Sequence, residues 1–371
     1  MVIGVPTEIK IHEYRVGLTP ASARELVERG HRVFVQSGAG AGIGMSDDEY
    51  VGAGAEIAPT AAEIFARADM IVKVKEPQEI ERRMLRRGQI LFTYLHLAPD
   101  APQACDLIAG GASCIAYETV TSASGGLPLL APMSEVAGRM AVQAGAHFLE
   151  KANGGIGILL GGVPGTDRGN VLVIGGGVVG VHAIDVALGL GASVTVLERN
   201  PEVLRGLWRQ FGARLTTAFA TRDAIERHCR AADLVIGAVL VPGAAAPKLV
   251  TAELVSRMKP GSVVVDVAID QGGCFATSRA TTHDDPTYTV DGVIHYCVAN
   301  MPGAVARTST FALNNATLPH VLALAEKGLV GALRADPHLR SGLNVYEGHI
   351  THPAVAEALE KPYTDPMRWL Q

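Results

Sequence analysis

A glycine-rich turn directly after an apolar stretch constrains the fold of this chain more than any other feature. Residues 171–174 (VLVI) predict a strand, and residues 175–180 (GGGVVG) open an expected helix that runs to Leu190. This G-x-G-x-x-G spacing between strand and helix is typical of the dinucleotide-binding unit of a doubly wound sheet, whereas the same triplet without that context would fit an ordinary tight turn. The glycines permit the tight turn, the approach of backbone N–H groups to a pyrophosphate, and close packing of helix on strand; they are Gly175, Gly177 and Gly180.

An acidic residue follows the next expected strand. Glu198 comes directly after the apolar residues 193–197. A carboxylate at this position can accept hydrogen bonds from the adenosine ribose and would repel a 2′-phosphate. Arg199 beside it could pair with a phosphate and argues the other way. On balance the sequence favours NAD over NADP.

Expected strands and helices alternate in two blocks. The first block has strands at residues 2–5, 31–35, 70–74 and 89–95, and helices at 20–30, 60–68 and 82–87. The second has strands at residues 171–174, 193–197, 234–238 and 262–268, and helices at 178–190 and 203–211. Alternation of this kind indicates parallel sheets covered by helices. The predicted fold class is therefore α/β, with two doubly wound Rossmann-like domains.

The remaining segments connect and complete these blocks. Residues 134–151 predict a helix, and the glycine-rich residues 154–169 predict a loop around one short strand. After residue 303 the chain reads as helical at 313–327 and 354–360, without a further set of strands, so we expect it to return to the first domain. We expect a discontinuous substrate domain of residues 1–130 and 305–371 and an NAD-binding domain of residues 131–304. We expect the active-site cleft between these two domains.

Composition excludes several classes of protein. The 371 residues carry a net charge of −5 and include 19% charged residues, so we expect no positively charged surface that would bind nucleic acid. The apolar stretches are shorter than the roughly 20 residues of a membrane-spanning helix, and residues 1–10 do not resemble a secretory signal, which favours a cytoplasmic protein without membrane partners. The five cysteines are scattered, which predicts free thiols, mostly buried, and no zinc site.

Four polar residues follow apolar strands or the loops after them, where open parallel sheets bind their ligands: Arg15, Lys75, His96 and Asp270. Each also has a structural interpretation. Lys75 shares a face with Lys73, so one of the two lysines could be a solvent-facing support. His96 suits acid–base chemistry because its reference pKa lies near neutrality, but it could be a structural histidine. Asp266 or Asp270 could cap the following glycine turn, and Arg15 could form a surface ion pair with a nearby glutamate.

Six blocks of sequence resemble the alanine dehydrogenase and pyridine nucleotide transhydrogenase family, from the start of the chain to near its end. They are GVPTEIK at residue 4 with ExRVGLTP at residue 13, KVKEP at residue 73, YLHLA at residue 94, PMSEVAGR at residue 132, DQGG at residue 270 and VANMPG at residue 298.

This resemblance implies an NAD-dependent enzyme that converts L-alanine reversibly to pyruvate and ammonium, as a homohexamer and without a metal. It implies that Arg15 and Lys75 bind the substrate carboxylate, that His96 donates and accepts the proton, and that Asp270 is the second catalytic group. Ser134 would bind the cofactor by a hydrogen bond. The cofactor groove would be lined by Val178, Val179, Glu198, Val239, Leu240, Val267, Arg279, Val298, Ala299, Asn300 and Met301.

Some positions depart from the family pattern. Val203 stands where relatives often have a basic residue near the adenosine, and Ala220 stands where a serine is common. Arg199 or Arg205 could replace the missing adenine-side contact. Ala323 and Lys327 stand where some relatives carry metal ligands, so we expect no metal there.

Three alternatives share part of this pattern. The first is the NAD-binding subunit of a proton-translocating transhydrogenase, and the second is a lysine- or saccharopine-type dehydrogenase of a larger amino acid. The third is an NAD-binding regulator without catalytic activity. A regulator would have no use for the set of Arg15, Lys75, His96 and Asp270, and the substrate-binding pair with His96 argues against the transhydrogenase.

Overall fold

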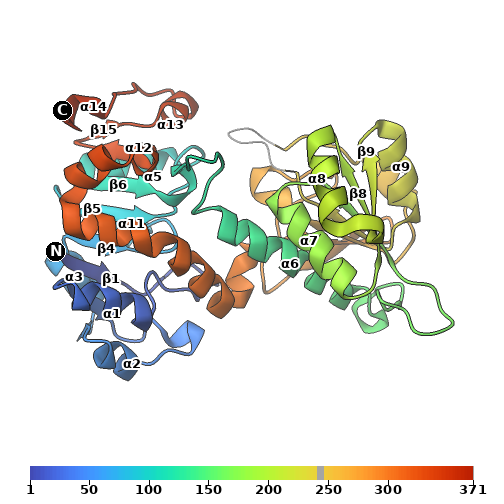
Figure 1. Cartoon of the computed structure of the whole chain (residues 1–371), viewed down its shortest axis with the longest axis horizontal. Coiled ribbons are helices and arrows are strands. Elements are labelled where there is room, and N and C mark those ends of the chain that lie inside the picture. Colours follow the sequence, from blue (N-terminus) through green and yellow to red (C-terminus); the bar gives the residue numbers. More distant parts are fainter. Residues whose placement is uncertain (240–245, 371) are drawn as a thin grey trace. The chain divides into compact units, whose positions relative to one another are not determined.

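The chain forms two compact α/β units (Figure 1). The computed structural model describes residues 1–239 and 246–370. The first unit comprises residues 1–133 and 305–371, and the second comprises residues 134–304. Each unit is built on one mostly parallel sheet, which confirms the predicted fold class of two doubly wound Rossmann-like domains.

The sheet of the first unit has the order β3-β2-β1-β4-β5-β6-β14-β15. The first six strands are parallel, and β14 and β15 extend the sheet antiparallel beyond β6. The order 3-2-1-4-5-6 is that of a doubly wound nucleotide-binding fold. The strands are β1 Val2–Val5, β2 Arg32–Gln36, β3 Glu56–Ala58, β4 Met70–Val72, β5 Ile90–Thr93, β6 Ser113–Ala116, β14 Leu343–Tyr346 and β15 His349–Ile350.

Helices cover this sheet, and their starts follow from the sequence. The predicted cap at Thr19 is confirmed, because its side chain accepts a hydrogen bond from Ser22 N and Pro20 is the first helical residue. The long α11, orange in Figure 1, crosses one face of the sheet and is kinked at Gly328. The helices are α1 Pro20–Glu28, η1 Ala41–Ile43, α2 Asp47–Gly52, α3 Ala61–Arg67, α4 Glu79–Arg82, α5 Ala101–Gly110, η2 Tyr117–Thr119, α11 Ala306–Ala335, α12 Pro337–Arg340, α13 Pro353–Ala358 and α14 Met367–Leu370.

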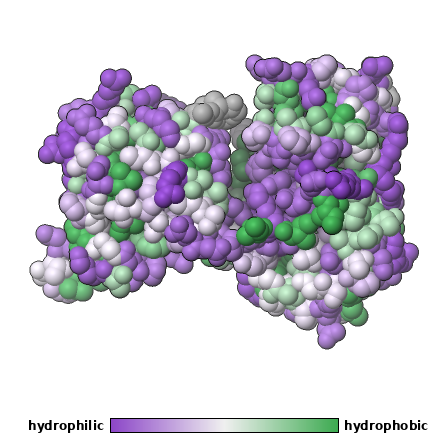
Figure 2. All heavy atoms as spheres, turned by 180° about the vertical axis from the view of Figure 1, so that it is seen from behind, coloured by the Kyte–Doolittle hydropathy of each residue, from purple (hydrophilic) through white to green (hydrophobic). Residues whose placement is uncertain are grey.

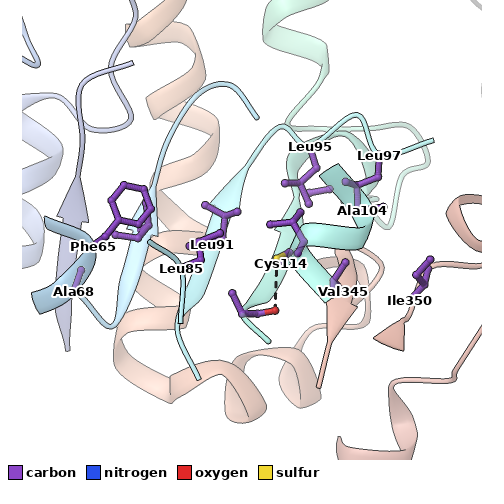
Figure 3. Close-up of a cluster of buried hydrophobic side chains, with 14 of the residues drawn as sticks. Phe65, Ala68, Leu85, Leu91, Leu95, Leu97, Ala104, Cys114, Val345 and Ile350 are labelled. Atoms are coloured by element: carbon purple, nitrogen blue, oxygen red, sulfur yellow. Dashed lines mark hydrogen bonds between the residues drawn. The ribbon is translucent and has the colours of Figure 1, made fainter. Parts of the chain in front are cut away.

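An apolar core fills the space between the strands and helices of the first unit. Figure 3 shows side chains from distant parts of the sequence packed in one cluster, among them Leu91 of β5, Cys114 of β6 and Val345 of β14. Leu95 and Leu97, which follow β5, are part of the same cluster and are almost completely buried. Burial of each leucine contributes about 2 kcal/mol, so the core fixes the chain on both sides of residue 96.

The second unit has the same strand order. Its sheet runs β9-β8-β7-β10-β11-β13-β12, parallel except for the antiparallel edge strand β12. The strands are β7 Asn170–Ile174, β8 Ser193–Glu198, β9 Leu215–Phe219, β10 Leu234–Gly237, β11 Val263–Asp266, β12 Thr287–Val290 and β13 Val293–Tyr296. The helices are α6 Ala131–Phe148, η3 Lys151–Asn153, α7 Val178–Gly189, α8 Pro201–Phe211, η4 Gly212–Arg214, α9 Arg222–Ala231, α10 Ala252–Val255, η5 Val267–Gln271 and η6 Met301–Val305.

Three predictions of local structure are wrong. Residues 154–169 contain no strand, because four of their glycines adopt a positive φ that an extended strand cannot accommodate. The helix expected at residues 82–87 is α4, which begins earlier at a capping box between Gln78 and Glu81 and ends at Arg82. After residue 303 the chain adds β14, which pairs with β6 far away in the sequence, and β15, which pairs with β14.

The surface in Figure 2 mixes hydrophilic and apolar side chains, and apolar ones gather only in separate groups on the face drawn. Some large apolar side chains are exposed, including Ile11, Trp208 and Leu159. Among residues 1–239 and 246–370, no helix is both long enough and apolar enough to cross a membrane.

Candidate active site

The strand order of the first unit brings the ends of β1, β4 and β5 side by side. The chain reverses its strand order between β1 and β4, and ligands of open parallel sheets bind beyond the carboxyl ends of the strands at such a switch point. Arg15 lies in the loop after β1, Lys75 lies shortly after β4, and His96 lies shortly after β5. The topology thus gathers three of the four predicted chemical residues at one edge of one sheet.

Arg15 is buried and is held by Glu13. Its Nε donates to Glu13 Oε1 at 2.6 Å and its Nη2 donates to Oε2 at 2.5 Å, while Nη1 lies 3.0 Å from Met133 Sδ. The alternative of an ion pair with a nearby glutamate is confirmed, but its expected place on the surface is wrong, because the arginine is only 2% exposed. Burial by itself lowers the pKa of Arg15, but the hydrogen bonds and charge of Glu13 outweigh burial and raise it. The guanidinium is therefore a permanent positive charge with a fixed orientation.

Helix α11 holds the segment that follows Arg15. Asn314 accepts a hydrogen bond from Thr19 N at 2.8 Å and donates one to Gly17 O at 3.0 Å, and Thr310 Oγ1 accepts from Val16 N at 3.3 Å. These two side chains of α11 are almost completely buried. Buried polar groups with satisfied hydrogen bonds have few alternative arrangements, so the loop that carries Arg15 is fixed by the C-terminal part of the chain.

Lys73 is not the solvent-facing support that the sequence allowed. It is fully buried, and its Nζ donates to Glu8 Oε2 at 3.0 Å and to Glu81 Oε1 at 2.8 Å. Burial lowers the pKa of Lys73, but the two carboxylates outweigh this effect and raise it. Glu8 also accepts from Val74 N at 2.6 Å, so this ionic group fixes the backbone just before Lys75.

Removing the positive charge of Lys73 should destabilise the first unit strongly. In Lys73→Met the carboxylates of Glu8 and Glu81 stay buried without their cation, which typically costs about 3–5 kcal/mol. Denaturant unfolding followed by circular dichroism measures the loss. Arg83→Met is the control, because Arg83 pairs with Glu79 on the surface and should change the free energy of unfolding by less than about 1 kcal/mol. Equal unfolding midpoints for the two variants would contradict the burial argument.

Lys75 and His96 lie near the same carboxylate. Glu76 accepts a hydrogen bond from Lys10 Nζ. Burial raises the pKa of Glu76, but the positive charges of Lys75, Lys10 and His96 outweigh burial and lower it. Such charge effects act mainly over a few ångströms. The other oxygen of Glu76 is buried without a hydrogen-bond partner.

His96 presents its side chain to solvent from a constrained backbone. It is exposed, its φ is +48°, and its ring stacks on that of Tyr94 with centroids 5.8 Å apart and planes 8° apart. Tyr94 is buried and donates its hydroxyl to Leu129 O, and burial raises its pKa well above the usual value. Tyr94 therefore remains a neutral support. An accessible imidazole at the sheet edge that also carries Arg15 and Lys75 can perform acid–base chemistry on a small anionic substrate.

The glycine turn of the second unit fits a dinucleotide. Gly175 has a φ of +105°, and a Cβ there would lie 2.7 Å from Ala238 O. A Cβ on Gly180 would lie 2.0 Å from Gly175 O, whereas one on Gly177 would meet nothing within 4 Å. Two glycines are thus required by packing, and the third leaves open space at the N-terminus of α7. Backbone N–H groups and the helix dipole favour a pyrophosphate at that place.

Glu198 lies at the end of β8, beside the glycine turn. Its Oε2 accepts from Gly176 N at 2.8 Å, and its Oε1 accepts from Arg199 N at 2.6 Å and from Asn200 N at 2.9 Å. A Cβ on Gly176 would lie 2.8 Å from Val203. The valine, which stands where relatives often have a basic residue, therefore places an apolar side chain next to the turn. These bonds orient a negative charge where an adenosine ribose would lie in this fold.

Asp270 belongs to the second unit, where it follows β11 as an exposed residue of η5. The turn-capping carboxylate is Asp266 instead. Asp266 is fully buried and accepts hydrogen bonds from Cys274 N at 2.9 Å, Phe275 N at 3.3 Å and Ser278 Oγ at 2.5 Å. The structural interpretation therefore applies to Asp266, and the side chain of Asp270 remains available to a ligand.

The predicted cofactor residues lie in several parts of the second unit. Val178 and Val179 begin α7, Val239 follows β10, and Val267 follows β11. Arg279 donates its backbone N–H to Tyr288 Oη at 2.8 Å, and its guanidinium lies 4.0 Å from the centre of that ring. Leu240 lies outside the described residues. The others lie at the start of α6 and in the segment from the end of β13 to the first residue of η6, and their roles stay predictions: Ser134, Val298, Ala299, Asn300 and Met301.

Sequence reasoning missed the residues that support this site. Glu13 and Glu76 lie inside the matching blocks, and their acidic side chains next to Arg15 and Lys75 were a usable signal. Glu118, which binds the backbone of His96, has no such signal because it lies in another segment. Within the described part of the chain, no group of three or more histidine, cysteine, aspartate or glutamate side chains could hold a metal ion. The cysteines are free, with Cys105 exposed and the other four buried.

Comparisons with known proteins cover nearly the whole chain. Residues 4–137 match the family model of the alanine dehydrogenase/PNT N-terminal domain, and residues 141–353 match that of the C-terminal domain. A curated alanine dehydrogenase from Halomonas elongata is 61% identical over 365 residues, which cover 98% of each chain. An alanine dehydrogenase from Mycolicibacterium smegmatis is 54% identical over 370 residues and the full length of both chains.

Solved structures give the same result. A structure described as L-alanine dehydrogenase has a TM-score of 0.95 at 52% identity and covers 97% of this chain and 99% of its own. A transhydrogenase from Sinorhizobium meliloti has a TM-score of 0.82 at 26% identity and covers 95% of this chain and 100% of its own. Both family models and these full-length relatives agree with the six sequence blocks and the two sheets, and the chain belongs to the alanine dehydrogenase/PNT family.

Proposed function

We propose that this chain is an NAD-dependent L-alanine dehydrogenase. The reaction converts L-alanine, NAD⁺ and water to pyruvate, ammonium, NADH and a proton, and it is reversible. The observation that carries the proposal is that Arg15, Lys75 and His96 follow β1, β4 and β5, whose carboxyl ends meet at the switch point of the first sheet. Two cations and one imidazole suit a small substrate that has a carboxylate and exchanges protons. The full-length relatives named alanine dehydrogenase support this choice of substrate.

The residues of the second unit hold the cofactor. A bound NAD would supply the hydride acceptor for the hydrogen of the alanine Cα. The N–H groups after Gly175 and at Gly177 would hold its pyrophosphate, and Glu198 would accept hydrogen bonds from its adenosine ribose. Ser134 would donate a hydrogen bond to it.

The residues of the first unit hold the substrate and move its protons. Arg15 binds the carboxylate with its planar guanidinium, and Lys75 adds a second positive charge. His96 takes a proton from the amino group and passes it to solvent; it then takes a proton from the water that attacks the iminium carbon and returns this proton to the departing ammonia. Asp270, a residue of the second unit, is the second catalytic group, which orients this water and balances the positive charge of the iminium nitrogen. Each group thus acts on the substrate or on water.

The proposal includes the setting in which the enzyme works. L-alanine, pyruvate and ammonium are its small-molecule partners, and nucleic acid and membranes are not. We expect a homohexamer in the cytoplasm, and sedimentation of the purified chain would test the oligomeric state.

Glu198 should set the preference for NAD. Replacing it with serine removes the negative charge that repels a 2′-phosphate, so the ratio of kcat/KM for NADP to that for NAD should rise about 10- to 100-fold. Glu226→Ser is the control, because Glu226 lies in α9 of the same unit and pairs with Arg257 instead of the glycine turn. An unchanged ratio in Glu198→Ser, or the same rise in Glu226→Ser, would contradict this role.

An assay of NADH formation with a panel of amino acids tests the proposed substrate. L-alanine should have the highest kcat/KM, with glycine and L-serine lower and D-alanine inactive. Saccharopine or L-lysine as the best substrate would move the assignment to a dehydrogenase of larger amino acids. No reduction of NAD by any amino acid would contradict the proposal.

A further inference from the structure

We infer that Glu118 is a positioning residue that holds His96 in place for proton transfer, an inference that rests on the proposed function. One oxygen of Glu118 accepts from His96 N at 2.6 Å and from Leu95 N at 3.2 Å, and its other oxygen lies 3.2 Å from Leu95 N. The carboxylate therefore binds two consecutive backbone N–H groups. Hydrogen bonds to an ionised acceptor are about twice as strong as those between neutral groups.

The backbone of His96 needs such support. Its φ of +48° lies in the left-handed region, which is unfavourable for a residue with a Cβ. Conformations of this kind persist where the surroundings impose them, and they are common at functional sites. The left-handed turn exposes the imidazole while the side chains on both sides of it point into the core.

The neighbours of His96 are fixed independently of Glu118. Leu95 and Leu97 are buried in the apolar cluster of Figure 3, and Leu95 O accepts from Gln103 Nε2 at 2.7 Å. These contacts anchor the chain before and after His96. Leu95 O and His96 N belong to one peptide group, which Gln103 holds at its carbonyl and Glu118 holds at its N–H, so Glu118 supplies the contact that fixes the His96 side of this peptide.

Glu118 is itself held by a rigid segment. It follows β6, the strand beside β5, and lies in η2. Before it, Tyr117 is buried and donates its hydroxyl to Lys73 O at 3.0 Å. After it, Thr119 donates to Ala116 O at 3.3 Å and accepts from Asn344 Nδ2 at 2.7 Å. The carboxylate therefore projects from a fixed point at the end of the adjacent strand.

This arrangement predicts a specific kinetic effect. Proton transfer requires the imidazole within a fraction of an ångström of its productive position, and a displacement of 1 Å can cost on the order of 100-fold in rate. Loss of the Glu118 contact should therefore lower kcat. The substrate cations do not depend on Glu118, because Arg15 is held by Glu13, so KM for pyruvate should change little.

Two substitutions separate the position of the acceptor from its charge. Glu118→Asp keeps the charge but is one methylene shorter, so it cannot reach His96 N, and kcat should fall about 10- to 100-fold. Glu118→Gln keeps the length and one acceptor oxygen, so kcat should stay within about threefold of the unsubstituted enzyme. In a crystal structure of the Asp variant, residue 96 should leave the left-handed region.

Each outcome decides the inference. An Asp variant with unchanged kcat would overturn it, and so would a folded Gln variant that loses more than about tenfold in kcat, since the charge would then matter more than the position. If the Asp variant fails to fold, Glu118→Leu replaces it, because leucine has no acceptor oxygen for His96 N, and an unchanged kcat in that variant would overturn the inference. Glu49→Asp is the matched control, because Glu49 Oε2 accepts from Ser46 N at 2.7 Å at the start of α2, and its kcat should not change. If the unsubstituted chain cannot oxidise L-alanine, the proposed function fails instead.

Discussion

Replacing His96 with asparagine should lower kcat for L-alanine oxidation by about 10²–10⁴-fold, the usual contribution of a general acid–base group. Asparagine tolerates the left-handed region, so the φ of +48° can be kept while the titratable ring is lost. KM for pyruvate should stay within a few-fold, because Arg15 and Lys75 remain. Steady-state rates of NADH formation and of pyruvate amination measure both constants.

His12 provides a matched control for this substitution. It is a second histidine of the first unit with a positive φ, +57°, and its ring contacts Tyr14. His12→Asn should therefore retain kcat if the loss in His96→Asn comes from chemistry and not from the change of residue type. A kcat for His96→Asn within about threefold of the unsubstituted value would remove His96 from the mechanism.

Replacing Gly180 with alanine should weaken NADH binding by about 100-fold and destabilise the second unit by about 1–3 kcal/mol. The added Cβ would lie 2.0 Å from Gly175 O, so α7 would have to move away from the turn that binds the pyrophosphate. Calorimetric titration with NADH gives the affinity, and thermal unfolding gives the stability.

Gly189→Ala in the same helix is the control. A Cβ on Gly189 would meet nothing within 4 Å, and the residue is exposed at the end of α7. Alanine favours a helix over glycine by about 1 kcal/mol, so this variant should be at least as stable as the unsubstituted chain and bind NADH normally. If Gly180→Ala bound NADH as tightly as Gly189→Ala, the close packing of the turn would not be needed for the cofactor.

Local patterns were sufficient to predict much of the fold. The cap at Thr19, the strand before Gly175 and the helix after it depend on neighbouring residues, and they were predicted within one or two positions. The strands β14 and β15 were missed because they are short, and because β14 pairs with β6, more than 200 residues earlier, while β15 pairs with β14. Their stability lies in tertiary pairing, which no local pattern records.

The candidate site could be predicted where it depends on local patterns and not where it depends on tertiary contacts. Arg15, Lys75 and His96 follow strands, so the sequence placed them at one edge of a sheet. The burial of Lys73 could not be predicted, because alternation along a strand does not show which face of a parallel sheet contacts solvent. The contact of Glu118 with His96 depends on the pairing of β6 with β5, and a residue in another segment gives no local signal.

The transfer of hydrogen from the alanine Cα to the cofactor is the central claim, and isotope transfer tests it directly. The purified chain is incubated with NAD and L-alanine deuterated at Cα, and the products are measured by mass spectrometry and chemical assay. We predict NADH that carries one deuterium on the nicotinamide ring, together with equal amounts of pyruvate and ammonium. NADH without deuterium, or no NADH in the presence of L-alanine, would contradict the account.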